Sequence, residues 1–189
     1  RGAFTRSTLR GNSRAPAPID RNSHDFLNAF VEFTRGSDIF KFGRSEMQYG
    51  AQRLISPLEW GNTRRTFEGA WWRNKDTDRT VDVFLTRPII VEPHGWDSRD
   101  NSRWFGGVYA TWSKLEQGVG DLYALVLDEN DEIIASGTGS LGDWTVFTVG
   151  GRRTWKDGNP ETEVEAAQQF GTRAGDEIKL TDSREAADS

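Results

Sequence analysis

Hydrophobic and polar residues alternate with a period of two along most of the chain from residue 24 onward. Because the side chains of a β-strand point alternately to the two faces of its sheet, this alternation predicts half-exposed strands. Polar turns separate the alternating segments, and the helical period of about 3.6 residues is hard to find. Seven to nine strands are expected, in the segments 25–33, 39–47, 66–74, 80–88, 105–113, 121–129, 133–142, 143–155 and 162–171.

The segment 80–88 has the clearest alternation. One face carries Val81, Val83 and Leu85, and the other carries Asp82, Phe84 and Thr86. A carboxylate in mid-strand among apolar neighbours needs water, so we expect the second face to border a wet lumen. Hairpin connections without a helix that could cover the sheet predict an antiparallel up-and-down topology.

The two ends of the chain differ from this middle part. Residues 1–23 are polar, with one weak strand pattern near 3–9, and are expected to form a strand or loop remnant. Residues 179–189 form a charged tail for which no structure is predicted. The β-rich segment is therefore placed at 24–178. Since the chain begins with Arg1 and its tail lacks a closing strand pattern, we expect it to be part of a longer protein.

Composition narrows the class of protein. The 189 residues include 24 basic and 29 acidic side chains, interspersed and with a net charge of −5, which is not the basic footprint of a nucleic-acid binder. There is no cysteine, so disulfide scaffolds and thiolate metal sites are not favoured. No apolar run reaches the length of about 18 residues that a transmembrane helix needs. Eight Trp and eleven Phe are the distinctive feature, typical of a β-domain core or of the aromatic girdles of membrane barrels.

Candidate chemistry of other kinds is sparse. His24 and His94 lie far apart without a partner at metal-ligand spacing, so no metal site and no cofactor are expected. Glu163 and Glu165 share a strand face with Cα atoms about 6.6 Å apart, at about 3.3 Å rise per residue. This is near the separation of a glycosidase pair. Neighbouring carboxylates on a solvated barrel wall are nevertheless common, so the chain is not predicted to be an enzyme.

A spaced series of unlike residues carries a family resemblance. It runs through Gly43-Arg44, Tyr49-Gly50, Gln52-Arg53-Leu54, Trp60, Asn62 and Arg64-Arg65-Thr66-Phe67-Glu68-Gly69, and continues in the blocks 105–110, 148–152 and 163–171. In this order the blocks resemble the alginate-export family of outer-membrane β-barrels, over about residues 25–178. One departure is Ser45-Glu46, where the family usually carries Gln-Glu.

The resemblance implies an all-β fold, namely an antiparallel up-and-down transmembrane β-barrel of which this chain forms an incomplete part. It also implies an outer-membrane porin surrounded by outer-membrane lipid. The expected cargo is an anionic polysaccharide such as alginate, or small anions. It would cross by passive, charge-selective diffusion through an arginine-lined lumen. Periplasmic export components are possible partners, and no nucleic acid is expected.

Charged residues in the strands and matched blocks are the candidate pore-lining and substrate residues. Guanidinium groups can hold carboxylates in bidentate pairs, and low-dielectric walls focus the field of a charged pore. Interspersed acids would position the arginines and keep binding weak. Structural salt bridges across the wall are the alternative role for each arginine. Of Arg64 and Arg65, only one can face inward. The candidates are Arg44, Arg53, Arg64, Arg65, Glu68, Asp82, Arg152 and Glu165.

Two other classes of protein remain open. A general or differently selective porin shares every fold signal, and the acidic balance of the chain keeps this class in view. A soluble β-sandwich that binds glycans is the second alternative. Its inward face would be apolar throughout, whereas Asp82, Arg152 and Glu165 occupy such positions here.

Overall fold

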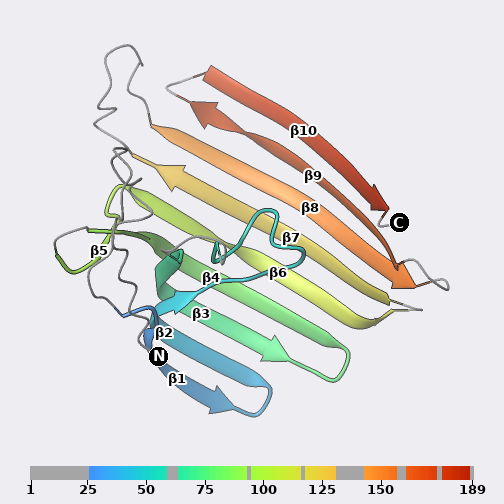
Figure 1. Cartoon of the computed structure of the whole chain (residues 1–189), viewed down its shortest axis with the longest axis horizontal. Helices are drawn as coiled ribbons and strands as arrows, with labels where there is room; N and C mark the ends of the chain where they lie inside the picture. Colours follow the sequence, from blue (N-terminus) through green and yellow to red (C-terminus); the bar gives the residue numbers. More distant parts are fainter. Residues whose placement is uncertain are drawn as a thin grey trace, which may run out of the picture.

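The computed structural model describes residues 26–58, 64–92, 95–115, 118–130, 143–156, 161–173 and 176–187. These residues form a ten-stranded sheet (Figure 1). Its strands are β1 (Ala29–Arg35), β2 (Asp38–Glu46), β3 (Thr66–Lys75), β4 (Arg79–Ile90), β5 (Ser98–Arg99), β6 (Arg103–Leu115), β7 (Gly118–Glu129), β8 (Trp144–Lys156), β9 (Glu161–Arg173) and β10 (Asp176–Ala187).

Every neighbouring pair of strands is antiparallel. The order is β1-β2-β3-β4-β6-β7-β8-β9-β10, and the short β5 pairs only with the end of β4. β1 and β10 lie at opposite edges, so the sheet is open and unclosed (Figure 1). This confirms the predicted all-β, up-and-down fold. In the described part of the chain, no helix is long and apolar enough to cross a membrane.

The connections differ in length at the two ends of the strands. At one end, the joins are the short segments 36–37, 76–78, 116–117 and 157–160. At the other end, the longer segments 47–65, 91–102 and 130–143 follow β2, β4 and β7, while β9 and β10 are joined by residues 174–175. Short turns at one end and longer loops at the other are typical of outer-membrane barrels. We call the second end the loop end.

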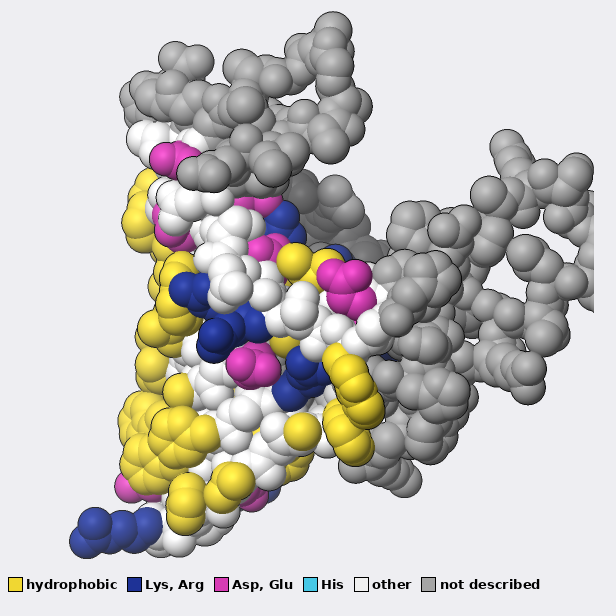
Figure 2. Space-filling view, turned by 90° about the vertical axis from the view of Figure 1, so that its left-hand side faces the viewer, with side chains coloured by type: hydrophobic (Ala, Val, Ile, Leu, Met, Phe, Trp, Pro, Cys, Tyr) yellow, Lys and Arg dark blue, Asp and Glu magenta, His cyan; other side chains and the backbone are white. Residues whose placement is uncertain are grey.

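One face of the sheet, here called the outer face, is apolar across its middle. Exposed side chains on it include Leu85 (53%), Leu122 (58%) and Phe42 (49%). Figure 2 shows hydrophobic side chains gathered along one edge of the molecule, with charged groups beside them. Apolar rows of this extent are unfavourable in water and typical of a lipid-facing barrel wall. Strand pairing aligns one such row as Val31, Phe42, Ala70, Leu85, Gly106, Val126, Phe147 and Phe170.

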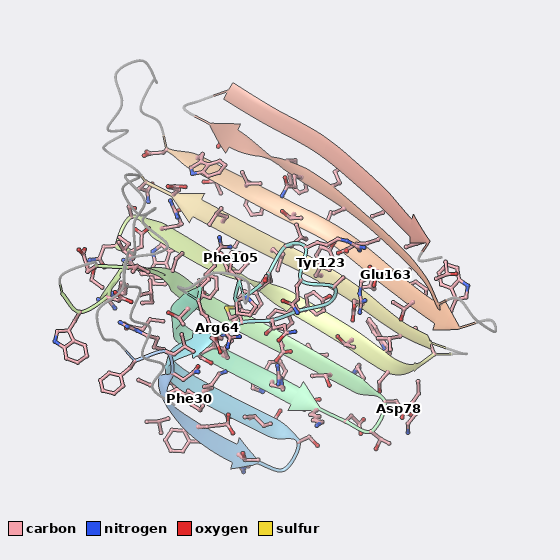
Figure 3. The ribbon with its side chains drawn as sticks, viewed as in Figure 1. Phe30, Arg64, Asp78, Phe105, Tyr123 and Glu163 are labelled. Atoms are coloured by element: carbon pink, nitrogen blue, oxygen red, sulfur yellow. The ribbon has the colours of Figure 1, made fainter. Side chains whose placement is uncertain are left out.

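The opposite face, here called the inner face, is aromatic and polar, and residues 47–58 lie across it (Figures 1 and 3). Tyr49 of this inner segment stacks on Phe84 and Tyr109, with ring centroids 5.6 and 4.7 Å apart. The rings of Tyr109 and Tyr123 stack in turn at 5.4 Å. The buried cluster consists of Met47, Ile55, Phe67, Trp71, Phe84, Tyr109, Tyr123 and Leu125.

Two expectations need correction. The alternation in β4 is confirmed, but its polar face is dry at this point, because the inner segment and the wall leave Asp82 4% and Thr86 0% exposed. The tail predicted to lack structure instead contributes β10, which pairs with β9 as far as Ala187. Main-chain hydrogen bonds hold an antiparallel pair whatever its side chains, so a charged sequence conceals an edge strand. The expectations for 1–23, for Trp60 and Asn62, and for 133–142 lie outside the described residues.

Candidate functional site

A tight turn directs the inner segment across the wall. The amide of Gln52 donates to the carbonyl of Tyr49 at 3.0 Å, and the amide of Tyr49 donates to that of Ile55 at 3.3 Å. Gly50 has φ +54°, and a Cβ atom there would lie 2.5 Å from the Tyr109 hydroxyl oxygen. Only glycine combines this backbone conformation with so close an approach. The turn thereby brings Arg53 from the β2–β3 connection to β9.

Arg53 joins the inner segment to the far side of the wall. Its Nη1 lies 2.8 Å from Oε2 of Glu165 and 2.5 Å from Oε1 of Glu163. The hydrogen bond to Glu165 raises the pKa of the Arg53 guanidinium above its ordinary value, so the group stays cationic. The two carboxylates side by side on β9 therefore form a docking point for the segment.

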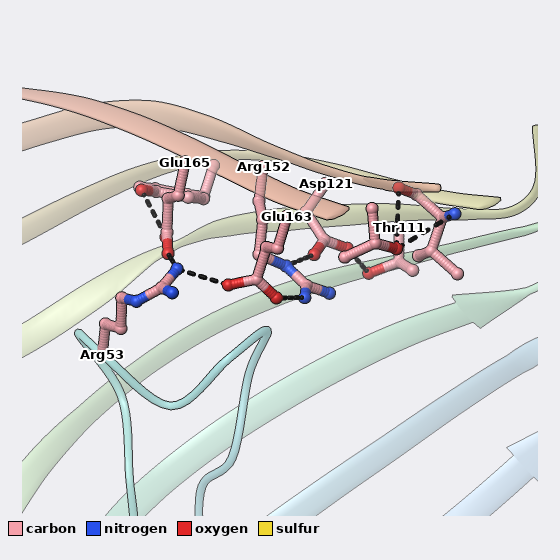
Figure 4. Close-up of polar contacts among 9 residues, drawn as sticks. Arg53, Thr111, Asp121, Arg152, Glu163 and Glu165 are labelled. Carbon is pink, nitrogen blue, oxygen red and sulfur yellow. Dashed lines mark hydrogen bonds and ion pairs between the residues drawn. The ribbon is translucent and has the colours of Figure 1, made fainter. Parts of the chain in front are cut away.

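A second arginine completes this network within the wall (Figure 4). Arg152 on β8 places Nε 2.6 Å from Oδ2 of Asp121 and Nη1 2.8 Å from Oε2 of Glu163. The Thr111 hydroxyl donates to the other oxygen of Asp121 at 2.8 Å, and the Tyr123 hydroxyl donates to Glu165 at 2.9 Å. We call Arg53, Thr111, Asp121, Tyr123, Arg152, Glu163 and Glu165 the central network. It contains two guanidinium groups and three carboxylates.

A smaller cluster lies on the β2–β4 side of the inner face. Arg73 binds Asp82 in a bidentate pair, with N–O distances of 2.6 and 3.1 Å. The Lys41 ammonium lies 4.9 Å from the Trp71 ring centroid and donates to the Ser45 hydroxyl at 3.0 Å. Here, too, the described cations are satisfied by neighbouring groups of the protein.

A cavity of about 400 Å³ opens at the loop end of the inner face. Leu54 and Ile55 of the inner segment form one side, and Phe105 is part of the wall. Arg65 and Arg103 line it as well, together with Glu129 and Trp144. Arg103 and the Trp144 indole both donate to the Glu129 carboxylate. The cavity therefore combines an apolar surface with a charged rim.

The structure brings most of the predicted site residues to the inner face. Arg53, Arg152 and Glu165 belong to the central network, and Asp82 pairs with Arg73. Arg65 lines the loop-end cavity, where the Pro57 carbonyl accepts its amide at 2.8 Å. Arg64 instead pairs with Glu46, its Nε 2.6 Å from Oε1.

Arg44 and Glu68, two further candidates, do not share this face. They pair directly across β2 and β3 on the outer face, with Arg44 Nη2 3.9 Å from Glu68 Oε2. Arg44 also donates to the Asp97 carbonyl at 2.9 Å, and Arg99 lies 3.5 Å from Glu68. Sequence alternation places Arg44 with Phe40 and Phe42, and those rings face outward. The strand simply continues beyond the apolar band into a polar rim.

Several residues of the inner-face site were not predicted from the sequence. Asp121 and Arg73 hold the two predicted partners Arg152 and Asp82, and Arg103 lines the cavity. Strand alternation carried the signal for Asp121 and Arg73, since Asp121 shares parity with Tyr123 and Arg73 with Trp71. Nothing in the sequence marked Arg103, because its importance comes from the approach of the inner segment.

The charged clusters resemble no hydrolytic or metal centre. Glu163 and Glu165, the pair with glycosidase-like spacing, are both bound by guanidinium groups. Among the residues that the structure describes, no three His, Asp or Glu side chains are grouped so that they could hold a metal ion.

The antiparallel sheet has an apolar outer face and a charged inner face, and a loop folds over the inner face. These features are typical of part of the wall of an outer-membrane β-barrel. The model of one family, described as "Alginate export", matches residues 4–187. The chain belongs to the alginate-export family, a family of outer-membrane polysaccharide transport. A search among curated proteins and among solved structures gives no match.

Proposed function

We propose that the inner face lines the lumen of an outer-membrane channel through which an anionic polysaccharide passes by passive, charge-selective diffusion. The observation that carries the proposal is the central network, in which Arg53 and Arg152 face the same side of the wall as the inner segment. Family membership supports the polysaccharide cargo, and the apolar outer face supports contact with outer-membrane lipid.

Exchange of ion-pair partners is the proposed means of conduction. A guanidinium with five N–H donors can accept a second carboxylate before it releases the first. Arg53 is paired with Glu163 and Glu165, yet 30% of its side chain remains accessible. A passing uronate would compete with these internal acids, so each contact is short-lived. The protein needs no cofactor for this, performs no catalysis, and could receive polymer from periplasmic export components.

A differently selective porin is the second candidate. It is favoured by one specific observation, namely that the central network holds three carboxylates for two guanidinium groups. A lumen with this balance would attract small cations unless the remainder of the wall reverses the field.

The two candidates differ in their ion selectivity. The test is the reversal potential of the full-length protein in a planar bilayer under a salt gradient, with and without added polyuronate. Anion selectivity and current block by polyuronate, without block by a neutral polysaccharide of equal length, are the expected results. Cation selectivity with no block by polyuronate would instead identify the differently selective porin.

A further inference from the structure

The loop-end cavity differs from the remaining inner face in the state of its cations. Arg65 is exposed, and within the described part of the chain its side chain has no ion pair. Arg103 shares Glu129 with Trp144, and its buried Nε has no hydrogen-bond acceptor among the described residues. Asp100 lies 3.8 Å from that Nε, beyond hydrogen-bond distance.

The charge of the cavity favours an anion. Its lining cations are Arg65 and Arg103; Arg103 is already paired with Glu129 and lies 3.8 Å from Asp100, so Arg65 is the cation that an anion can approach. A carboxylate is the natural partner for an exposed guanidinium, because the planar fork of N–H donors matches its two oxygens.

The size and apolar surface of the cavity favour a ring. Its volume of about 400 Å³ is within the usual range of small-molecule sites, about 300–1,000 Å³. Leu54 and Ile55 on one side and Phe105 and Leu127 on the wall supply apolar contacts. A pyranose has apolar C–H faces and polar edges, so it fits between such surfaces while its carboxylate reaches the rim.

We propose that this cavity is a binding subsite for a single acidic sugar residue, with the carboxylate at Arg65 and the ring beside Leu54 and Ile55. The inference rests on the proposed function, which supplies the acidic polymer. It adds to the channel a site at which the polymer binds transiently. Because the longer loops of an outer-membrane barrel are extracellular, the subsite lies at the exit of the channel.

The test measures binding of two matched ligands to the full-length protein in detergent micelles by isothermal titration calorimetry. One ligand is a short oligouronate, and the other is the same oligosaccharide with its carboxylates reduced to neutral hydroxymethyl groups. Arg65→Gln is expected to weaken oligouronate binding about five- to tenfold, the effect of losing one charge-assisted hydrogen bond at a partly exposed site. Binding of the neutral ligand should not change.

Two further variants make the result specific. Arg99→Gln removes another exposed guanidinium, one that lies on the outer face beside Glu68, and should leave both affinities unchanged. Leu54→Ser removes an apolar contact and should weaken both ligands by a similar factor, because it acts on the ring. Wild-type affinity in Arg65→Gln would overturn the subsite, as would an equal loss for both ligands.

Failure of the subsite is distinguishable from failure of the channel. If polyuronate blocks the wild-type current in a bilayer and Arg65→Gln still binds oligouronate normally, the cavity proposal is wrong and the channel stands. If wild-type protein shows neither block nor binding, the proposed cargo itself is wrong.

Discussion

The central network and the loop-end cavity lie on the same face of one sheet but use their arginines differently. In the central network, Arg53 and Arg152 are each bound by two carboxylates of the protein. In the cavity, Arg65 has no such partner among the described residues, and Glu129 is shared between Arg103 and Trp144. Guanidinium groups that are saturated by the fold stabilise it, whereas unsaturated ones are available to a ligand.

This difference follows from where the strands place the acids. β9 carries Glu163 and Glu165 on the inner face, where the inner segment crosses it. At the loop-end cavity, the described acids Glu129 and Asp100 both lie beside Arg103, and neither pairs with Arg65. We therefore expect substitutions in the central network to change stability first, and substitutions in the cavity to change binding first.

The largest expected effect is that of Arg152→Met. Its side chain is 13% exposed and its partner Asp121 only 2%, so the change leaves a buried carboxylate without its cation. Breaking such a pair typically costs about 3–5 kcal/mol, and we expect about 3 kcal/mol because Thr111 still donates to Asp121. Urea unfolding in detergent micelles, followed by tryptophan fluorescence, measures the free energy of unfolding. A loss below about 1 kcal/mol would mean that water satisfies Asp121.

Gly50→Ala should have the next largest effect, about 2 kcal/mol, because it strains the turn that seats the inner segment. Gly36→Ala is a matched control: both glycines have positive φ, +54° and +60°, but a Cβ at Gly36 meets nothing within 4 Å. Gly36→Ala should therefore cost only about 1 kcal/mol, the backbone part of the penalty. The same unfolding assay compares them. Equal losses would show that the close approach to the Tyr109 hydroxyl is relieved without cost.

Arg53→Gln should cost less, about 1 kcal/mol, since 30% of this side chain is accessible and water can replace part of the ion pair. The substitution should also change the ion selectivity of the channel. The central network would keep three carboxylates against one guanidinium, so the reversal potential in a salt gradient should shift toward cations. Gln48→Glu makes the same change in net charge at an exposed position of the inner segment outside the central network, and is a control for charge alone. An unchanged reversal potential in Arg53→Gln would remove Arg53 from the ion path.

The sequence predicted the sheet better than it predicted the site. Alternation identified both faces of β4 correctly, because the apolar outer row leaves a strong period-two signal. Arg44 was a pore-lining candidate because it lies in a matched block, whereas its parity with Phe40 and Phe42 agrees with its position on the outer face. Alternation failed for Arg103 and for the dry surroundings of Asp82, since both depend on the inner segment.

Long-range contacts explain that failure in physical terms. Arg53 reaches Glu165 across 112 positions of sequence, and no local pattern encodes such a contact. The glycine that permits it was visible as part of the Tyr49-Gly50 block. The sequence could not show why a glycine is required at this position, because the close approach of Gly50 to Tyr109 exists only once β2 through β6 have assembled.

The smallest expected change in stability is that of Arg65→Gln. The side chain is exposed and, within the described residues, bound by no carboxylate, so its loss should alter the free energy of unfolding by less than about 0.5 kcal/mol. The amide of Arg65 still donates to the Pro57 carbonyl, so the backbone of the cavity rim is kept. Unfolding of Arg65→Gln and Arg53→Gln in parallel gives the sharpest form of the comparison. If Arg65→Gln loses as much as Arg53→Gln, then Arg65 is a structural residue and the distinction between saturated and available arginines fails.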